Sequence, residues 1–123
     1  MNTQPPDQRG QRDAGPARTG STAARGNIYL SRETCDSYLA GVAAVAVLSR
    51  EDHVMIVPLA RESAGGMLLK IRNSRGDRVI HAQEFFRERG FVEDSREHPL
   101  EVRWSAEAGA LVVSGIPKIT EGL

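Results

Sequence analysis

One cysteine and three histidines are the side chains of this 123-residue chain best suited to nucleophilic chemistry. Cys35 paired with His53 or His81 would give a thiolate and an imidazole, because a cysteine nucleophile needs a neighbouring base or cation to lower its pKa. Cys35 falls, however, on the same side of a short predicted helix as Leu39, a pattern typical of a small buried apolar residue. We therefore expect no catalytic cysteine, with a redox-sensing or intermolecular thiol as the alternative.

The histidines and carboxylates predict neither a metal site nor acid and base catalysis. His53, His81 and His98 are separated by 28 and 17 residues, so no two of them share a helical turn as in a pre-formed zinc site. The acidic residues lie mostly beside arginines in turns, as in Arg50-Glu51-Asp52, which is typical of solvated charge pairs. No Walker loop, GxGxxG or GxSxG motif occurs. We expect no enzyme, no metal and no cofactor.

The most informative polar feature is a basic stretch between residues 70 and 89. Six basic residues stand there against three acidic ones, a local charge of +3 in a chain with 16 basic and 16 acidic residues: Lys70, Arg72, Arg75, Arg78, Arg87 and Arg89. Strand alternation puts Lys70 and Arg72 on one face, and Arg78 is expected to join them across a turn. Such a surface suits an acidic protein or phosphates, or is simply a solvated face. Phe85 and Phe86 are expected in the core, which leaves no exposed aromatic residue for stacking bases.

The elements that position this surface follow from residues 65–90. Met67 to Ile71 is an apolar run, Asn73 to Gly76 has the composition of a turn, and Val79 and Ile80 resume a strand. Residues 82–89 are then expected to form a helix that ends at Gly90. The stretch therefore predicts a hairpin that leads into a short helix.

Elsewhere the pattern indicates further hairpins and one more helix. Ser31 is placed as the N-cap of a helix over residues 32–40. The expected strands cover residues 28–30, 42–48, 53–59, 100–104 and 110–114, the last two forming a hairpin. Sequential hairpins with two short helices predict an α+β fold built on a small antiparallel sheet. Its short, open edges favour a homodimer.

Composition divides the chain into three parts. Residues 1–26 contain three prolines, four glycines and four arginines, and no residue more apolar than alanine after Met1, which predicts a disordered tail. Residues 27–116 are expected to form a single domain, and residues 117–123 a C-terminal tail. The lone cysteine excludes an intramolecular disulfide, and the chain carries no apolar run of membrane-spanning length. We expect a soluble cytoplasmic protein.

Residues 27–59 carry a resemblance to a known family. A strand at Ile28 to Leu30 is followed by a short helix from Arg32, a Gly41-Val42 step, and a hairpin that ends in Ile56-Val57-Pro58-Leu59. This pattern resembles the half-repeat of AbrB-like swapped-hairpin proteins. The resemblance implies an intertwined dimer whose basic face binds DNA, as in transcription regulators and antitoxins.

Two functions follow as expectations. The leading one is a small non-catalytic module that binds another protein, as an accessory or assembly factor of a larger enzyme complex, through the basic residues between 70 and 89. The alternative is an AbrB-like DNA-binding regulator or antitoxin, in which Lys70, Arg72, Arg75 and Arg78 contact phosphates. Near-zero net charge favours the protein partner over nucleic acid.

Overall fold

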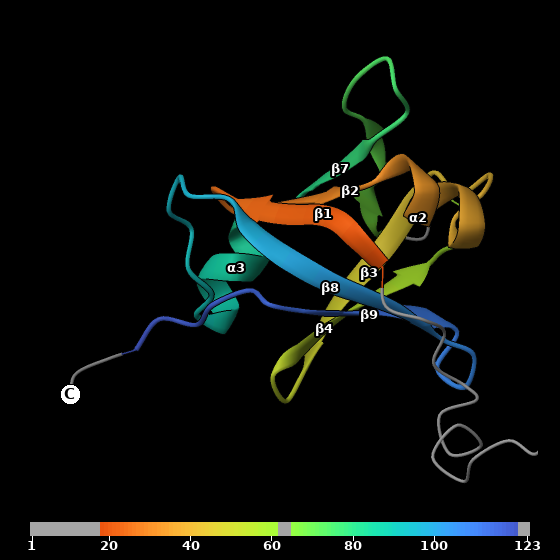
Figure 1. The fold of residues 1–123 in the computed structure, drawn as a ribbon. Coiled ribbons are helices and arrows are strands. Elements are labelled where there is room, and N and C mark those ends of the chain that lie inside the picture. The colour runs from red at the N-terminus through yellow and green to blue at the C-terminus, as the bar shows by residue number, and fades with distance from the viewer. Residues whose placement is uncertain (1–17, 62–64, 121–123) are drawn as a thin grey trace, which may run out of the picture.

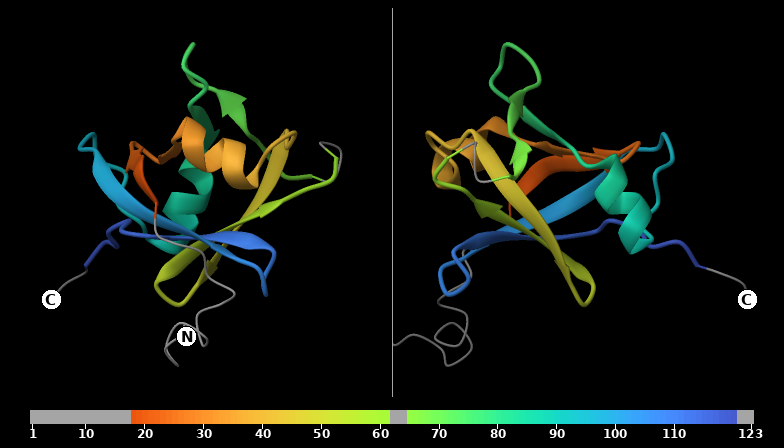
Figure 2. Two further views of the ribbon diagram at one scale, coloured as in Figure 1. Left: turned by 45° about the vertical axis from the view of Figure 1, so that its right-hand side comes forward. Right: turned by 180° about the vertical axis from the view of Figure 1, so that it is seen from behind.

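The computed structural model describes residues 18–61 and 65–120, which form nine strands and two short helices (Figure 1). The strands are all antiparallel to their neighbours and form one sheet in the order β5-β3-β4-β9-β8-β1-β2-β7-β6. They are β1 (Arg18–Ala24), β2 (Asn27–Leu30), β3 (Ala44–Arg50), β4 (His53–Pro58), β5 (Met67–Leu68), β6 (Lys70–Ile71), β7 (Arg78–His81), β8 (His98–Ser105) and β9 (Ala110–Ser114). The sheet curls into a nearly closed barrel (Figure 2).

A two-residue period in the strands fills the interior of this barrel. Inward positions carry branched apolar residues, and the largest fully buried side chains of the strands are Ile28, Leu30, Val45, Val54, Ile56, Ile80, Val102, Leu111 and Val113. The alternate positions face outward, as in any sheet with one buried face. Burial of these side chains is the main favourable term in folding a domain of this size.

The segment from Met67 to Ile71 nearly closes the barrel by serving both ends of the sheet. Its first part, β5, pairs with β3, and its second part, β6, pairs with β7. Leu69 lies between them, donates its backbone N–H to the carbonyl of Ala43 at 2.9 Å, and is buried. Because this one short segment pairs first with β3 and then with β7, it connects the two ends of the sheet.

The helices α2 (Arg32–Tyr38) and α3 (Gln83–Arg89) lie on opposite sides of the barrel (Figures 1 and 2). Ser31 is the N-cap of α2, and its side chain accepts a hydrogen bond from the backbone of Thr34. Gly90 ends α3 in the left-handed conformation that glycine adopts without a steric penalty. The start of α2 and the end of α3 were predicted from these residue types.

Three aromatic residues hold α3 against the barrel. Phe85, Phe86 and Phe91 are buried, and their ring centroids lie 5.7 to 6.4 Å apart. The expectation that Phe85 and Phe86 belong to the core is confirmed. Behind Phe91, the chain from residue 116 to 119 runs alongside, with a bridge between Phe91 and Lys118 and a bond from Val92 N–H to the carbonyl of Pro117. The first residues of the expected C-terminal tail therefore pack on the domain.

The expected fold class is correct in its antiparallel sheet and two short helices, but the α+β assignment is wrong. The fold is mostly β, because the sheet curls into a barrel and each helix has only seven residues. The expected sequence of hairpins does not distinguish an open sheet from a curled one, since both use the same local pairings.

The expected domain boundary at residue 26 is also wrong, because β1 lies between β8 and β2 in the sheet. Small residues fill its inward positions: Ser21 and Ala23 are 1% exposed, and Ser21 Oγ accepts a hydrogen bond from Ser31 N–H at 3.1 Å. A strand without large apolar residues gives no hydrophobic signal and is stabilised mainly by its ladder bonds. Residues 1–17, the rest of the expected tail, lie outside the described residues, as do 121–123 of the C-terminal tail.

Candidate functional site

The basic hairpin, defined here as residues 70–78, projects from one end of the barrel (Figure 1, green loop). Its tip is held by side-chain bonds. Asn73 Oδ1 accepts hydrogen bonds from the N–H groups of Arg75 at 3.0 Å and Asp77 at 3.2 Å. Asn73 Nδ2 in turn donates to Asp77 Oδ2 at 3.0 Å. These bonds fix the shape of the turn locally, as Asn and Asp side chains commonly do.

Asp77 also ties the hairpin to helix α2. Its Oδ1 accepts a hydrogen bond of 2.9 Å from the N–H of Arg32, the first residue of the helix, which has no partner within the helix. The bonds from Asn73 and from the Arg32 backbone lower the pKa of Asp77 below its ordinary value of 3.8. The hairpin therefore sits on the barrel through a carboxylate that is charged at neutral pH.

Lys70 and Arg72 share the outer face of the hairpin, as predicted. In the register of the sheet, Tyr29, Val79 and Lys70 form one row across β2, β7 and β6. The guanidinium of Arg72 lies over the Tyr29 ring, 4.1 Å from its centroid, in a cation–π contact. Val79, which faces outward in this row, is only 6% exposed. The result is an exposed cationic surface with an aromatic residue beneath it, which we call the Arg72–Tyr29 surface.

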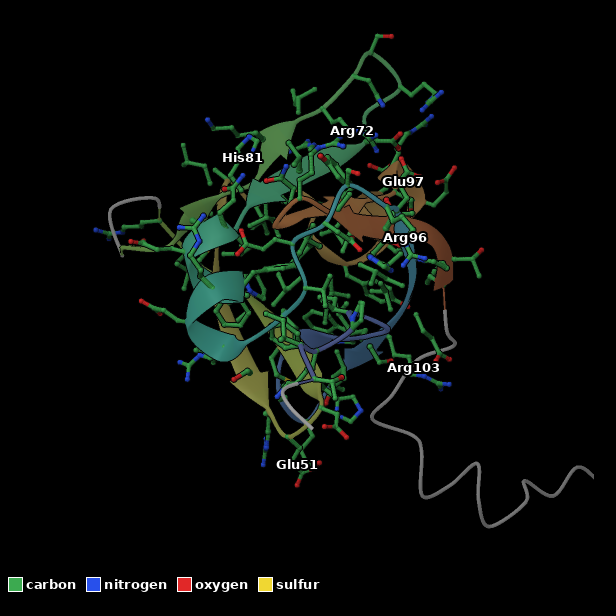
Figure 3. The ribbon with its side chains drawn as sticks, turned by 90° about the vertical axis from the view of Figure 1, so that its left-hand side faces the viewer. Glu51, Arg72, His81, Arg96, Glu97 and Arg103 are labelled. Atoms are coloured by element: carbon green, nitrogen blue, oxygen red, sulfur yellow. The ribbon has the colours of Figure 1, made fainter. Side chains whose placement is uncertain are left out.

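A chain of hydrogen bonds extends this surface toward His81, labelled with Arg72 in Figure 3. Asn27 Nδ2 donates to the hydroxyl of Tyr29 at 3.1 Å, and Asn27 Oδ1 lies 3.1 Å from His81 Nδ1. With the amide in this orientation, Nδ1 carries a proton and donates to Asn27, which leaves Nε2 of the exposed imidazole toward solvent. Tyr29, Asn27 and His81 are thus fixed in relation to one another on one outer face.

Arg78 does not join Lys70 and Arg72, contrary to the prediction. It stands opposite Ile71 and Leu30 in the register, and Leu30 is a core residue, so Arg78 points to the inner side of the sheet. It is half-buried, and its buried Nε has no hydrogen-bond partner among the described residues. Its positive charge opposes the larger effect of burial on the pKa of the Cys35 thiol in helix α2.

Three further arginines of the predicted surface are engaged locally. Arg75 forms an ion pair with Asp77 at 3.1 Å, and Arg87 pairs with Glu93 at 3.4 Å. Arg89 lies over the Phe85 ring at 5.8 Å. Exposed pairs of this kind contribute little to stability. The expected +3 charge already includes Asp77, so of these partners only Glu93 lowers it, to +2. The cationic surface is therefore smaller than the sequence suggests and centres on Lys70 and Arg72.

Tyr29 is the residue of this site that the sequence reasoning missed. Its position between Ile28 and Leu30 on an alternating strand already placed it on the face opposite the core. What the sequence does not show is that β7 and β6 follow β2 in the sheet, which brings Arg72 over the Tyr29 ring. The alternation in β2 was enough to place an exposed aromatic side chain at position 29. Arg72, the cation that lies over this ring, is 43 positions away in the sequence.

Cys35 is buried, at 4% exposure, as expected for an apolar core residue. Burial raises the pKa of its thiol to about 11, against the opposing effect of Arg78. The thiol is thus protonated at neutral pH and shielded from solvent. Neither property suits a cysteine nucleophile.

The three histidines are dispersed over the molecule. His98 lies 2.8 Å from the carboxylate of Asp94, His81 contacts Asn27, and His53 lies on β4 at the opposite end from the basic hairpin. Among residues 18–61 and 65–120, no three His, Cys, Asp or Glu side chains gather as a metal site would require. None of the helices in this part of the chain is long and apolar enough to cross a membrane.

An open cleft of about 420 Å³ lies at the end opposite the basic hairpin, where Figure 3 labels Glu51. The β3–β4 and β8–β9 turns form its walls, and its lining mixes charged and apolar residues: Arg50, Glu51, His53, Met55, Ser105, Glu107, Ala108 and Val112. No hydrogen bond or ion pair joins its charged side chains to one another among the described residues.

Comparison with known proteins gives no match of the chain to a family model, to a curated protein or to a solved structure. The resemblance of residues 27–59 to AbrB-like proteins stays a prediction.

Proposed function

We propose that the chain is a non-catalytic module that binds an acidic protein surface through the basic hairpin. The observation that carries the proposal is the Arg72–Tyr29 surface: two exposed cations, Lys70 and Arg72, on a projecting hairpin whose tip is braced by Asn73 and Asp77. A braced hairpin loses little conformational entropy when it binds, which favours a specific interface. Tyrosine and arginine are also the residue types that most often carry binding energy in interfaces.

Exposed apolar side chains on and next to the hairpin favour a protein partner. Ile71, on the face of the hairpin opposite to Lys70 and Arg72, is 69% exposed, and Leu68 in β5 is 46% exposed. Protein interfaces combine apolar contacts with a charged rim, whereas phosphate backbones offer no apolar surface to bury. With Arg75 and Arg87 already paired to carboxylates, few cations remain for phosphates.

A role as an accessory or assembly factor of a larger enzyme complex is the form of this proposal that we favour. Such a factor acts by docking alone, and a domain of this size can present one rigid surface without chemistry of its own. The partner would carry aspartate or glutamate side chains against Lys70 and Arg72, and an apolar patch that contacts Ile71 on the other face of the hairpin. Docking of this kind depends only moderately on salt, since few charges take part.

DNA binding is the second candidate, and one observation favours it. The basic hairpin is a two-stranded ribbon that extends beyond the barrel with Lys70, Arg72 and Arg75 on it. The major groove of B-DNA admits a ribbon of this width. A DNA complex would weaken steeply with salt, because each phosphate contact releases condensed counterions.

The test is affinity capture from an extract of the cells that make the protein, with nuclease-treated and high-salt arms. Wild-type protein is compared with the double variant Lys70→Glu/Arg72→Glu and with the matched control Arg96→Glu/Arg103→Glu. The control reverses two exposed arginines away from the hairpin, each beside an acidic residue (Figure 3). We expect one protein that survives nuclease and moderate salt, is retained by the control, and is reduced at least tenfold by the hairpin variant.

Two results would contradict the proposal. Equal capture by the hairpin variant and the control would remove the hairpin from the interface. Capture of DNA that disappears with nuclease or salt would favour the regulator. Thermal unfolding of both variants near the wild-type temperature shows that a lost partner reflects the surface and not the fold, since exposed charges contribute little to stability.

A further inference from the structure

Strand β3 is paired along its whole length on one side only. On that side β4 matches it from Val45 opposite Pro58 to Arg50 opposite His53. On the other side β5 pairs only with Ala44 and Val45. Among the described residues, positions 46–50 have no strand on that edge. The near closure of the barrel therefore leaves this stretch of β3 as an open edge, at the end where the β3–β4 turn projects away from the basic hairpin (Figure 2).

The register identifies which backbone groups point to this open edge. Leu59 N–H donates to the carbonyl of Ala44, so Ala44 directs its backbone groups toward β4, and by antiparallel alternation Ala46, Leu48 and Arg50 do the same. Leu69 N–H donates to the carbonyl of Ala43, so the odd-numbered positions direct theirs away from β4. The N–H and C=O groups of Val47 and Ser49 consequently face the open edge.

The same edge carries an exposed apolar residue. Leu48 is 50% exposed and faces outward opposite Met55, which in turn stands opposite Val112 on β9. Ala46 and Val57 form the next outward pair. We call these five residues the apolar face. Open edges of natural sheets are usually protected by charges, prolines or bulges. Here the one charged residue of the open stretch, Arg50, stands at its end, and Leu48 occupies its centre.

We propose that two copies of the chain pair through β3 in an antiparallel, two-fold symmetric arrangement centred on Leu48. In this register Val47 of each copy stands opposite Ser49 of the other. Val47 and Ser49 then exchange both backbone hydrogen bonds, so all four groups on each open edge find a partner. Symmetric pairing of this kind is the commonest form of protein dimer.

The side chains fit the same register. The two Leu48 residues lie directly opposite each other as a non-hydrogen-bonded pair, where side chains approach most closely. Arg50 of each copy stands opposite the small Ala46 of the other, so no like charges meet within the strand pair. The two apolar faces become continuous across the dimer. Neither the register nor these contacts depends on what the basic hairpin binds, so the two proposals can fail separately.

A cysteine placed at the symmetry axis tests the geometry. Opposed Cα atoms of a non-hydrogen-bonded pair lie about 4.5 Å apart, within the range of a disulfide. We expect Leu48→Cys, incubated with oxidised glutathione, to give a disulfide-linked dimer on a non-reducing gel. The native Cys35 is buried, so the wild type serves as the blank. Ile71→Cys, at a position 69% exposed, measures cross-linking by random collision.

We expect Leu48→Cys to cross-link at least tenfold faster than Ile71→Cys. Ser49→Cys should cross-link no faster than Ile71→Cys, because position 49 faces Val47 of the second copy. Equal rates for Leu48→Cys and Ile71→Cys, or no dimer from Leu48→Cys, would overturn the proposal.

Sedimentation equilibrium supplies an independent measurement on the unmodified chain. We expect a mass that rises with concentration from 13.4 kDa toward twice that value. Ser49→Pro removes an edge N–H that β4 does not use, and should raise the dissociation constant at least tenfold while the far-ultraviolet circular dichroism stays that of the wild type. A wild-type mass that stays at 13.4 kDa up to millimolar concentration would exclude the dimer.

Discussion

The outer surface of this barrel differs sharply between its two ends. Around β2, β7 and β6 the outward positions carry Asn27, Tyr29, His81, Lys70 and Arg72, joined by a cation–π contact and hydrogen bonds. Around β3, β4 and β9 they carry the apolar face. Both surfaces come from the same two-residue alternation, and in all of these strands except β6, where Ile71 is exposed, the opposite side of the strand faces the core. The difference lies entirely in which residues stand at the outward positions.

The edges of the sheet also differ between the two ends of the barrel. At the basic end, β7 continues into a hairpin whose tip is closed by Asn73 and Asp77, and whose cations discourage pairing with another strand. At the apolar end, β3 presents free backbone groups beside Leu48. The two proposed interfaces thus have different physical bases: charge and a rigid hairpin at one end, backbone hydrogen bonds and apolar burial at the other.

The largest expected effect is that of a proline at position 48 of β3, which is compared with a proline at the neighbouring position 49. Leu48→Pro removes an N–H that bonds to β4 and leaves a carbonyl in the ladder without its donor, which should lower the free energy of unfolding by about 3 kcal/mol. Ser49→Pro removes an N–H that faces the open edge and should cost less than about 1 kcal/mol in the monomer. Urea unfolding at a concentration where the protein is monomeric measures both.

The pair of prolines tests the assignment of the edge directly. Similar losses for Leu48→Pro and Ser49→Pro would mean that both positions are hydrogen-bonded within the monomer. A larger loss for Ser49→Pro would reverse the register and place the free groups on the even-numbered residues.

Local structure near the basic hairpin was predictable because its signals are local. Ser31 and Gly90 mark helix ends by their own conformational preferences, and Asn73 to Gly76 marks a turn. The alternation that puts Lys70 and Arg72 on one face needs only adjacent residues. The positions of Arg78 and Tyr29 relative to them were not predictable, because both depend on the register between β6, β7 and β2.

The barrel itself was not predictable for the same reason. β1 consists of small and polar residues, and it is held by ladder bonds to β8 and β2 rather than by apolar side chains. The near closure depends on Leu69, where one apolar run changes partners from β3 to β7. A hydrophobic pattern reports the faces of strands but says nothing of which strands are neighbours.

The next prediction concerns the attachment of the basic hairpin to the barrel. Asp77→Ala removes the acceptor for the Arg32 N–H and for Asn73, and should lower the free energy of unfolding by about 1 kcal/mol, as loss of a helix-capping side chain typically does. Asp94→Ala, at an exposed ion pair in a charged loop, serves as the control and should have a smaller effect. An equal effect of the two changes would show that Asp77 does not anchor the hairpin.

Acid titration of stability sharpens this prediction. The pKa of Asp77 is lowered in the folded state, so its contribution to stability is present above the ordinary value of 3.8 and is lost as the pH falls through the lower folded value. Asp77→Asn should therefore flatten the acid side of the stability curve, and its cost relative to the wild type should shrink as the pH falls below 3.8. A variant whose loss of stability is the same throughout the acid range as at pH 7 would mean that the charge of Asp77 is unimportant.

The smallest expected effects come from two changes at Tyr29, which distinguish the contribution of its ring from that of its hydroxyl. Tyr29→Phe keeps the aromatic face under Arg72 and removes only the part-buried hydrogen bond from Asn27, so stability should fall by only about 0.5 kcal/mol. Tyr29→Leu removes the cation–π contact and should cost about 0.5 to 1 kcal/mol. If Tyr29→Phe proved the more damaging in urea unfolding, the hydrogen bonds to Asn27 and His81 would organise this surface in place of the Arg72 contact.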